Sequence, residues 1–274
     1  MPSDTGREVY RGYIQLSGNA EQLNDELAAV EADGLYTNQY VLMTDTETGK
    51  TTEMRFDGEK FVDLRLPPSG YIKAKNPLQR CALDMLMNKD IEIAAILGTY
   101  GSGKSFLTTQ MGLYHVVEKG SQSKLLGVRE PTGDGAPVGY LKGTLEDKTR
   151  SFFLPIEQQL KGGEFELEAL RQRGVLDTNI PYYMKGTTYD NTIMLVDEAE
   201  DLSEAQIRLV GTRLGKNSRI FFSGDYGQSL IDNTASNPLV RMCGELKGNK
   251  NFACVYLGED VRSNASKLFA NLFK

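Results

Sequence analysis

The chain of 274 residues has few of the side chains that build cross-links and metal clusters. It contains three cysteines and one histidine, and Cys81, Cys243 and Cys254 lie far apart without a CxxC spacing. Disulfide frameworks and structural zinc sites need several such residues at defined spacings, so we expect neither. His115, the single histidine, is expected to be a packed or exposed side chain and not a metal ligand.

Long apolar runs and an excess of basic residues are also missing. No hydrophobic stretch reaches the roughly 18 residues of a membrane-spanning helix, and the first residues do not read as a secretory leader. We therefore expect no membrane partner and a cytoplasmic protein. A net charge of −6 at pH 7 argues against non-specific coating of nucleic acid, but it does not exclude a local basic track.

The chain does contain a glycine-rich segment, Gly98-Thr-Tyr-Gly-Ser-Gly-Lys104-Ser105, between an apolar run and a helix-like segment. This pattern in this context indicates a phosphate-binding P-loop, in which glycines let backbone N–H groups point at a phosphate beside a helix N-terminus. Lys104 is then expected to meet the β- and γ-phosphates, and the Ser105 hydroxyl to ligate Mg²⁺. The alternative is a glycine-rich turn with an incidental lysine. The residues expected to contact nucleotide here are Gly98, Thr99, Tyr100, Gly101, Ser102, Gly103, Lys104, Ser105 and Phe106.

A second segment has the features of a Walker B strand. The continuous apolar run 192–196 ends in Asp197 and Glu198, with Glu200 two residues on. Parallel strands covered on both faces have such runs, and open α/β sheets bind ligands at the carboxyl ends of their strands. We expect Asp197 to serve Mg²⁺ and Glu198 to orient or deprotonate the attacking water. Without the P-loop, the acids would be better interpreted as an acidic helix N-terminus.

A third apolar strand, 219–222, ends in a polar turn that contains Asp225 and Gln228. In P-loop motor proteins a polar side chain beyond the strand next to Walker B senses the γ-phosphate. By itself this turn would be ordinary, and only its position gives it that meaning.

Together these segments resemble the PhoH-like ATPases, whose core is similar to the first RecA-like domain of superfamily 1 helicases. The resemblance runs from Asn76 to about Phe273 and rests on the order and spacing of its segments. Besides the motifs above, these segments are Gln79, Arg129-Glu-Pro131, Gly139-Tyr-Leu-Lys-Gly143, Thr212-Arg-Leu214 and Asp260-Val-Arg262.

The resemblance implies ATP as substrate, Mg²⁺ as cofactor and roles for three further side chains. Gln79 looks like the glutamine that reads adenine ahead of helicase P-loops. Arg129 looks like an arginine near the phosphates or a nucleic-acid path, and Arg262 like a finger arginine for the transferring phosphoryl group. A surface glutamine and a surface arginine are the alternatives for Gln79 and Arg262.

This sequence also departs from the family pattern. Members commonly carry Arg-Gly-Arg-Thr before Walker B and a glutamine after its Glu-Ala, where this chain has Met184-Lys185-Gly186-Thr187 and Glu200. The loss of a basic group weakens the expected binding of RNA or single-stranded DNA. Candidate contacts to a strand are Lys142, Lys148, Arg150, Arg171, Arg173 and Lys185, with Tyr182 and Tyr183 as stacking rings. The alternative is a solvated face interleaved with acids.

The pattern predicts an α/β chain in two parts. Residues 1–70 form a small α+β N-terminal module, with strands over 10–16, 38–44, 51–56 and 61–66 and a helix over 19–32. No chemistry is visible in this module, and we interpret it as a packing or interaction unit.

Residues 76–274 form the ATPase domain, a three-layer P-loop NTPase core of the RecA-like type with a mostly parallel sheet. Its expected strands are 91–97, 124–128, 192–196, 219–222 and 253–257. Its expected helices are 78–87, 105–117, 147–159, 165–173, 203–213 and 265–273. Only one RecA-like lobe fits, so we expect a homo-oligomer, such as a ring, in which a neighbour completes the ATP site.

The sequence thus predicts an ATP-binding, Mg-dependent ATP-hydrolysing protein with RNA or single-stranded DNA as a further partner. The expected catalytic residues are Glu198, Lys104, Arg262 and Gln228. The alternative is a nucleotide-gated protein-interaction module with slow or no turnover.

Overall fold

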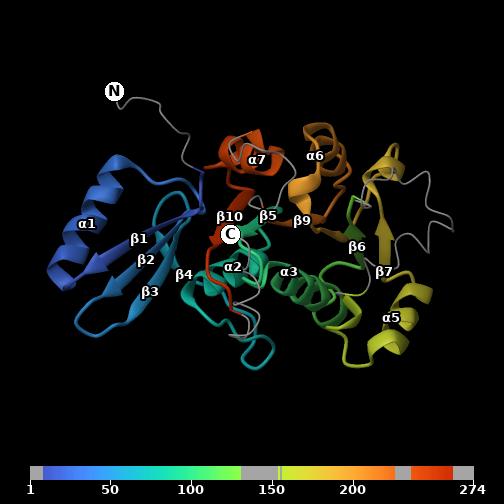
Figure 1. Ribbon diagram of the computed structural model, residues 1–274, viewed down its shortest axis with the longest axis horizontal. Helices are drawn as coiled ribbons and strands as arrows, with labels where there is room; N and C mark the ends of the chain where they lie inside the picture. Colours follow the sequence, from blue (N-terminus) through green and yellow to red (C-terminus); the bar gives the residue numbers. More distant parts are fainter. Residues whose placement is uncertain (1–8, 131–153, 155, 226–235, 262–274) are drawn as a thin grey trace, which may run out of the picture.

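The computed structural model describes residues 9–130, 154, 156–225 and 236–261, and they form two sheets with their helices (Figure 1). The first sheet has the order β1-β2-β3-β4 and the second the order β10-β5-β9-β8-β6-β7. Every neighbouring pair in the six-stranded sheet is parallel. The predicted α/β class, with a parallel sheet after a small α+β module, is confirmed.

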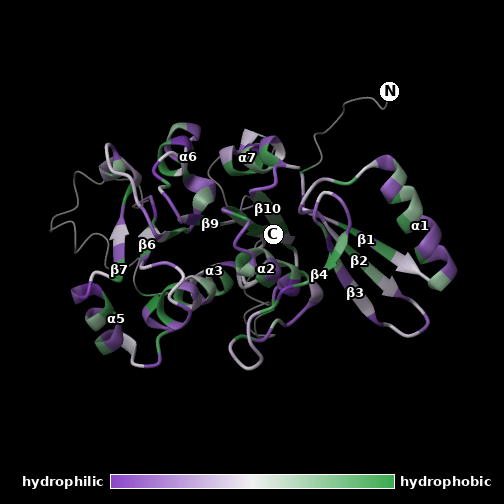
Figure 2. Ribbon diagram, turned by 180° about the vertical axis from the view of Figure 1, so that it is seen from behind, coloured by the Kyte–Doolittle hydropathy of each residue, from purple (hydrophilic) through white to green (hydrophobic). Residues whose placement is uncertain are grey.

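The N-terminal module has the predicted order of one strand, one helix and three strands. It consists of β1 (Tyr13–Gly18), α1 (Ala20–Asp33), β2 (Tyr40–Asp45), β3 (Thr51–Phe56) and β4 (Phe61–Asp63). β1 pairs with β2 in parallel, and the other two pairs are antiparallel. Hydrophilic and hydrophobic residues are interleaved along α1 (Figure 2), which packs on the sheet through Leu23, Leu27 and Val30.

The large sheet brings the predicted motifs to one edge. Its strands are β5 (Ile93–Gly98), β6 (Lys124–Val128), β7 (Leu176–Asn179), β8 (Thr192–Val196), β9 (Arg219–Gly224) and β10 (Phe252–Leu257). β9 lies between β5, which precedes the P-loop, and β8, which precedes the Walker B acids. Because all strands are parallel, the segments that follow β5, β9 and β8 meet at the same carboxyl edge.

Alternate residues of the strands enter two separate cores. In β8, for example, Ile193 and Leu195 belong to one hydrophobic cluster and Met194 and Val196 to the other. The first cluster includes α2 (Pro77–Met87), α3 (Lys104–Leu113) and α5 (Gly163–Gln172), and the second includes α6 (Glu204–Gly211) and α7 (Pro238–Leu246). Figure 1 shows the two sets of helices on opposite sides of the sheet, which is the predicted three-layer arrangement.

The structure differs from the predicted elements in several places. β7 and α7 were not expected, β1 begins later, and β4 ends earlier than its predicted strand. The predicted helix 105–117 is α3 followed by a π-helical turn, Tyr114–Glu118. Two short 3₁₀ turns, η3 (Pro181–Met184) and η4 (Ala199–Asp201), were also unexpected. Most of the predicted helix 147–159 and all of 265–273 lie outside the described residues.

The N-terminal module is joined to the core by a buried polar network. Asp84 of α2 accepts hydrogen bonds from the Tyr40 hydroxyl at 2.8 Å, from Arg55 Nε at 2.9 Å and from the Arg65 amide at 2.6 Å. Its side chain is fully buried. The segment before β1 also lies along β10, where the Tyr256 amide donates to the Arg11 carbonyl at 3.0 Å. The module therefore covers an edge strand that would otherwise expose unpaired backbone groups.

Candidate nucleotide site

The glycine-rich segment connects β5 to α3 and needs glycine at three positions. Gly98, Gly101 and Gly103 have φ angles of +152°, +81° and +93°, a region that favours residues without a Cβ atom. A Cβ atom on Gly98 would also overlap the carbonyl oxygen of Leu257 at the end of β10. Both the backbone conformation and the close approach of β10 therefore fix glycine at position 98.

Neighbouring elements hold the loop from two sides. The Thr99 amide donates to the Leu257 carbonyl at 3.1 Å, and the Val261 amide donates to the Gly101 carbonyl at 3.1 Å. On the α2 side, Gln79 Nε2 donates to the Ser102 carbonyl at 2.9 Å. The loop is thus shaped by β10 and α2 as well as by its own sequence.

Lys104 bends back over the loop that it follows. Its Nζ donates to the carbonyl oxygens of Gly98 and Thr99, each at 2.9 Å. The loop thus surrounds the ammonium group of Lys104. A phosphate that enters the loop can replace the two carbonyls as the partner of this group.

The glycine-rich segment and the acids that follow β8 meet through an oxygen-rich contact. Asp197 Oδ1 accepts from the Ser105 hydroxyl at 2.7 Å and from the Ser223 hydroxyl at 2.7 Å. A carboxylate and a hydroxyl are ligands that suit the hard Mg²⁺ ion, which usually completes its shell with water and substrate phosphates. This donor set fits Mg²⁺. The described residues contain no group of three or more His, Cys, Asp or Glu side chains that could hold a metal by itself.

Glu198 lies in a strained backbone position and is paired with a cation. Its φ of +51° is uncommon for a residue with a side chain, and its carboxylate forms an ion pair with Arg129. Burial raises the pKa of Glu198 above its ordinary value, and Arg129 opposes this increase. Arg129 thus lies next to the acids that follow β8, and in this conformation it is paired with Glu198, the predicted general base.

The remaining predicted site residues differ in their accessibility. Tyr100 and Phe106 are exposed, while Asp225 is buried at the end of β9. Gln79 is also buried, and its two amide atoms bond the Lys75 amide at 2.8 Å and the Ser102 carbonyl. Its role as a reader of adenine stays a prediction. Gln228 and Arg262 lie outside the described residues.

Ser223 is the residue of this site that the sequence analysis did not assign. It is buried at the end of β9 and contacts the same carboxylate oxygen as Ser105. Its position at the carboxyl end of a strand that neighbours β8 was the available signal, but serine in a Ser-Gly-Asp turn is too common to single out.

The predicted nucleic-acid contacts that the structure describes come from more than one element. Tyr182 and Tyr183 of η3 are exposed and lie edge to face, and Lys185 Nζ lies 5.4 Å from the centre of the Tyr182 ring. Arg171 belongs to α5, a different element, where it pairs with Glu168 at 3.1 Å. Lys142, Lys148 and Arg150 lie outside the described residues.

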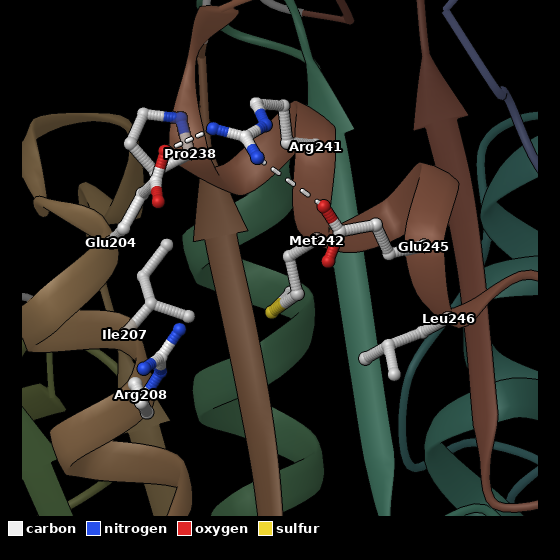
Figure 3. Close-up of a pocket in the computed structure, with 8 residues that line it drawn as sticks. All are labelled: Glu204, Ile207, Arg208, Pro238, Arg241, Met242, Glu245 and Leu246. Atoms are coloured by element: carbon white, nitrogen blue, oxygen red, sulfur yellow. Dashed lines mark hydrogen bonds and ion pairs between the residues drawn. The ribbon is translucent and has the colours of Figure 1, made fainter.

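A groove of about 410 Å³ runs between α6 and α7 (Figure 3). Apolar side chains, Ile207, Met242 and Leu246, line it, and Arg241 bridges Glu204 and Glu245 at its rim. α6 follows the Walker B acids in the chain, and the Asn237 side chain before α7 donates to the Glu200 carbonyl at 3.1 Å. The groove thus lies between two helices that begin beside the candidate site.

Comparison with known proteins gives matches across most of the chain. The chain is 27% identical over 300 residues to Protein PhoH2 of Bacillus subtilis (strain 168), with 97% of this chain and 64% of that protein covered. It is 29% identical over 209 residues to Protein PhoH2 of Thermobispora bispora, with 74% and 48% covered. It therefore spans about half to two thirds of the length of these relatives.

A solved structure, the Arterivirus nonstructural protein 10 (helicase), matches 79% of this chain and 47% of its own, at 15% identity and a TM-score of 0.33. Among the described residues, no helix combines the length and the apolar character needed to cross a membrane. The model of the PhoH-like protein family matches residues 71–274, the part of the chain that carries the P-loop and the Walker B acids. The chain belongs to the family of PhoH-like proteins.

Proposed function

We propose that this protein binds ATP with Mg²⁺ at the loop 98–104 and hydrolyses it. The observation that carries the proposal is the contact between Ser105 and Asp197, which brings the P-loop hydroxyl and the Walker B carboxylate to 2.7 Å. Phosphate-binding amides, a lysine and an oxygen-based Mg²⁺ site then converge at one sheet edge.

Each side chain at this edge of the sheet has a separate role in the proposed hydrolysis. Lys104 exchanges the carbonyls of Gly98 and Thr99 for the β- and γ-phosphates, and Ser105 and Asp197 hold Mg²⁺. When bound there, Mg²⁺ would supply positive charge against the charge that develops on the phosphate oxygens. Glu198 turns from Arg129 to the attacking water, which it orients or deprotonates.

The residues outside this central group have supporting roles in the proposal. Asp225 and Gln228 contact the γ-phosphate side, Arg262 stabilises charge on the transferring group, and Gln79 reads adenine after it releases its backbone partners. Exposed Tyr100 and Phe106 flank the nucleotide.

Phosphate release with two variants tests the enzyme. Lys104→Ala removes the cation that meets the phosphates and should abolish both nucleotide binding and turnover. Glu198→Gln keeps the shape of the site and should slow turnover about 100-fold or more while binding persists. Lys124→Ala, which removes a half-buried lysine paired with the exposed Asp177, is the matched control and should leave both unchanged. Hydrolysis that is indifferent to both site variants would exclude this function.

A nucleotide-gated interaction module is the second candidate. The ion pair between Arg129 and Glu198 favours it, because an acid held by a cation is not free to act on water. Binding of ATP with Mg²⁺ but no release of phosphate, in the wild type and in Arg129→Ala alike, would select the module over the enzyme.

We also propose that hydrolysis is coupled to RNA or single-stranded DNA, with Tyr182 and Tyr183 as rings on which bases stack. The rings are 68% and 55% exposed, and Lys185 beside them supplies positive charge for a phosphate.

Stacking contributes about 1–3 kcal/mol per base, so Tyr182→Ala with Tyr183→Ala should weaken binding of a single strand at least tenfold in fluorescence anisotropy. Phe165→Ala, which removes an aromatic ring that is 87% exposed on α5, is the control. Equal affinities for all three proteins would remove these rings from the proposal.

A homo-oligomer completes the proposal, because a single RecA-like lobe leaves one side of the nucleotide for a neighbouring subunit to cover. Light scattering in the presence of nucleotide measures the assembly. A single-chain mass at concentrations that support turnover would contradict it.

A further inference from the structure

Glu200 is a buried acid that contacts several elements of the site but has no role in the proposed reaction. It lies in η4, two residues after Glu198, and only 6% of its surface is exposed. Its carboxyl packs against the end of β9 so closely that a Cβ atom on Gly224 would lie 2.7 Å from Oε2. Its carbonyl accepts from the Asn237 side chain, which caps α7. Glu200 therefore joins the Walker B turn to β9 and α7.

The groups that act on this carboxyl come from three elements. Lys104 of α3 and Asp201 of its own turn act on it through their charges, and the backbone amide of Asp225 at the end of β9 donates to it. α7 approaches the same place with two uncharged residues, Asn237 and Leu239. The charges of one cation and one acid therefore act on a carboxyl that is almost shielded from water.

Burial is the largest influence on this group and raises the pKa of Glu200 to about 7, with a smaller increase from Asp201. The amides of Glu200 and Asp225, and the charge of Lys104, act in the opposite direction. The carboxyl therefore changes charge near neutral pH, where ordinary glutamates are fully ionised.

Binding of a triphosphate changes two of these influences in the same sense. Lys104 pairs with the phosphates and no longer offsets the negative charge of Glu200. The phosphates also bring negative charge toward the same region. Both changes disfavour an ionised carboxylate at position 200. By linkage, a group that gains protons on ligand binding must weaken ligand binding when it is deprotonated.

We propose that Glu200 takes up one proton from solvent when a nucleoside triphosphate binds, so that a neutral carboxyl holds the Walker B turn against β9 and α7. Glu200 is then a positioning residue that makes nucleotide affinity depend on pH. This inference rests on the proposed binding of ATP at the P-loop.

The experiment measures protons directly and avoids turnover. Two proteins are compared by titration calorimetry, the single variant Glu198→Gln and the double variant that also carries Glu200→Gln. Each is titrated with ATP and Mg²⁺ at pH 7.5 in PIPES, HEPES and Tris, three buffers whose ionisation enthalpies differ. The slope of the binding heat against these enthalpies gives the protons taken up. We expect the single variant to take up several tenths of a proton more than the double variant, since glutamine has the same shape but cannot titrate.

The outcomes separate this inference from the proposed function. Heats of binding with equal proton numbers in the two proteins overturn the role of Glu200 and leave ATP binding intact. Absence of binding heat in both proteins overturns ATP binding itself.

A second measurement on the single variant covers the case in which the double variant does not fold. Its dissociation constant for ATP should rise about sixfold between pH 6.5 and 8.5 if the bound nucleotide raises the pKa by one unit, and more for a larger increase. An affinity that stays constant over this range overturns the proposal.

Discussion

At the scale of single residues, His115 illustrates how burial selects one charge state. Its Nε2 lies 2.8 Å from the Leu86 carbonyl and 3.1 Å from Arg219 Nη1. Burial and the adjacent guanidinium of Arg219 lower the pKa of His115 from 6.5 to about 4. The folded state therefore binds fewer protons than the unfolded chain between these two pH values, so stability is present above pH 6.5 and is lost as pH falls toward 4.

We expect the free energy of unfolding to fall by up to about 3 kcal/mol over this range because of His115, at about 1.4 kcal/mol per pKa unit. His115→Gln should remove this part of the slope in urea unfolding curves, while the slope from the acids remains. Since His115 is the only histidine, one imidazole signal in a proton NMR titration reports its pKa. A midpoint near 6.5 in the folded protein would contradict the expectation.

Single residues also show which contacts of the candidate site could be predicted from the sequence and which could not. The pairing of Ser105 with Asp197 follows from two motifs whose spacing is well defined, and the structure has them 2.7 Å apart. Ser223 completes the same contact from a turn without a distinctive pattern. Arg129 was expected near the phosphates or a nucleic-acid path, and the structure pairs it with Glu198. Glu198 has an αL backbone conformation, which no local sequence pattern predicts.

At the scale of elements, strands with continuous apolar runs were predictable and edge elements were not. β6 and β8 have the predicted bounds, because both of their faces are covered. β7 was missed because its Leu-Asp-Thr-Asn sequence is short and polar and pairs only with β6. For α7 a signal was present, since Asn237 caps a helix that has proline at its first position.

The N-terminal cap of α6 allows a test at this scale. Ser203 accepts from the Gln206 amide, and Gln206 reaches back to the Ser203 amide at 2.8 Å. Gln206 also donates to Glu130 at 2.7 Å, which ties the start of α6 to the end of β6. We expect Ser203→Ala to lower the free energy of unfolding by about 1 kcal/mol in urea titrations, and Ser203→Gly by only a few tenths. Two variants as stable as the wild type would show that the cap does not stabilise this helix.

At the scale of the whole molecule, one helix connects the N-terminal sheet to the proposed nucleotide site. α2 carries Gln79 in its first turn, which bonds the glycine-rich loop at Ser102, and Asp84 further on, which bonds Tyr40 and Arg55 of the N-terminal sheet. The apolar patterns of the module predicted its strands, but they gave no sign of this polar attachment. A buried aspartate has the same sequence signature as an exposed one, so only the tertiary structure reveals it.

Asp84 should therefore control how the two parts of the chain hold together. Asp84→Ala leaves the Arg55 guanidinium buried without its carboxylate, which costs about 3–5 kcal/mol for ion pairs of this kind. We expect that loss in urea unfolding, together with faster hydrogen exchange in β2 and β3. Arg80→Ala is the matched control, because Arg80 also pairs α2 with β3, through Glu53 at 3.1 Å, but its side chain is 45% exposed.

The control should cost less than Asp84→Ala, since solvent screens the Arg80 end of its pair, whereas both partners of the Asp84 pair are buried. Replacing both buried partners, as in Arg55→Met with Asp84→Leu, should recover much of the stability, because no charge is then left unpaired in the interior. If Asp84→Ala and Arg80→Ala were equally mild, the buried network would not be what fixes the module to α2. The attachment would then rest on contacts that these substitutions leave in place, namely the segment 10–12 along β10 and the Asn38 side chain, which donates to the carbonyls of Lys250 and Phe252.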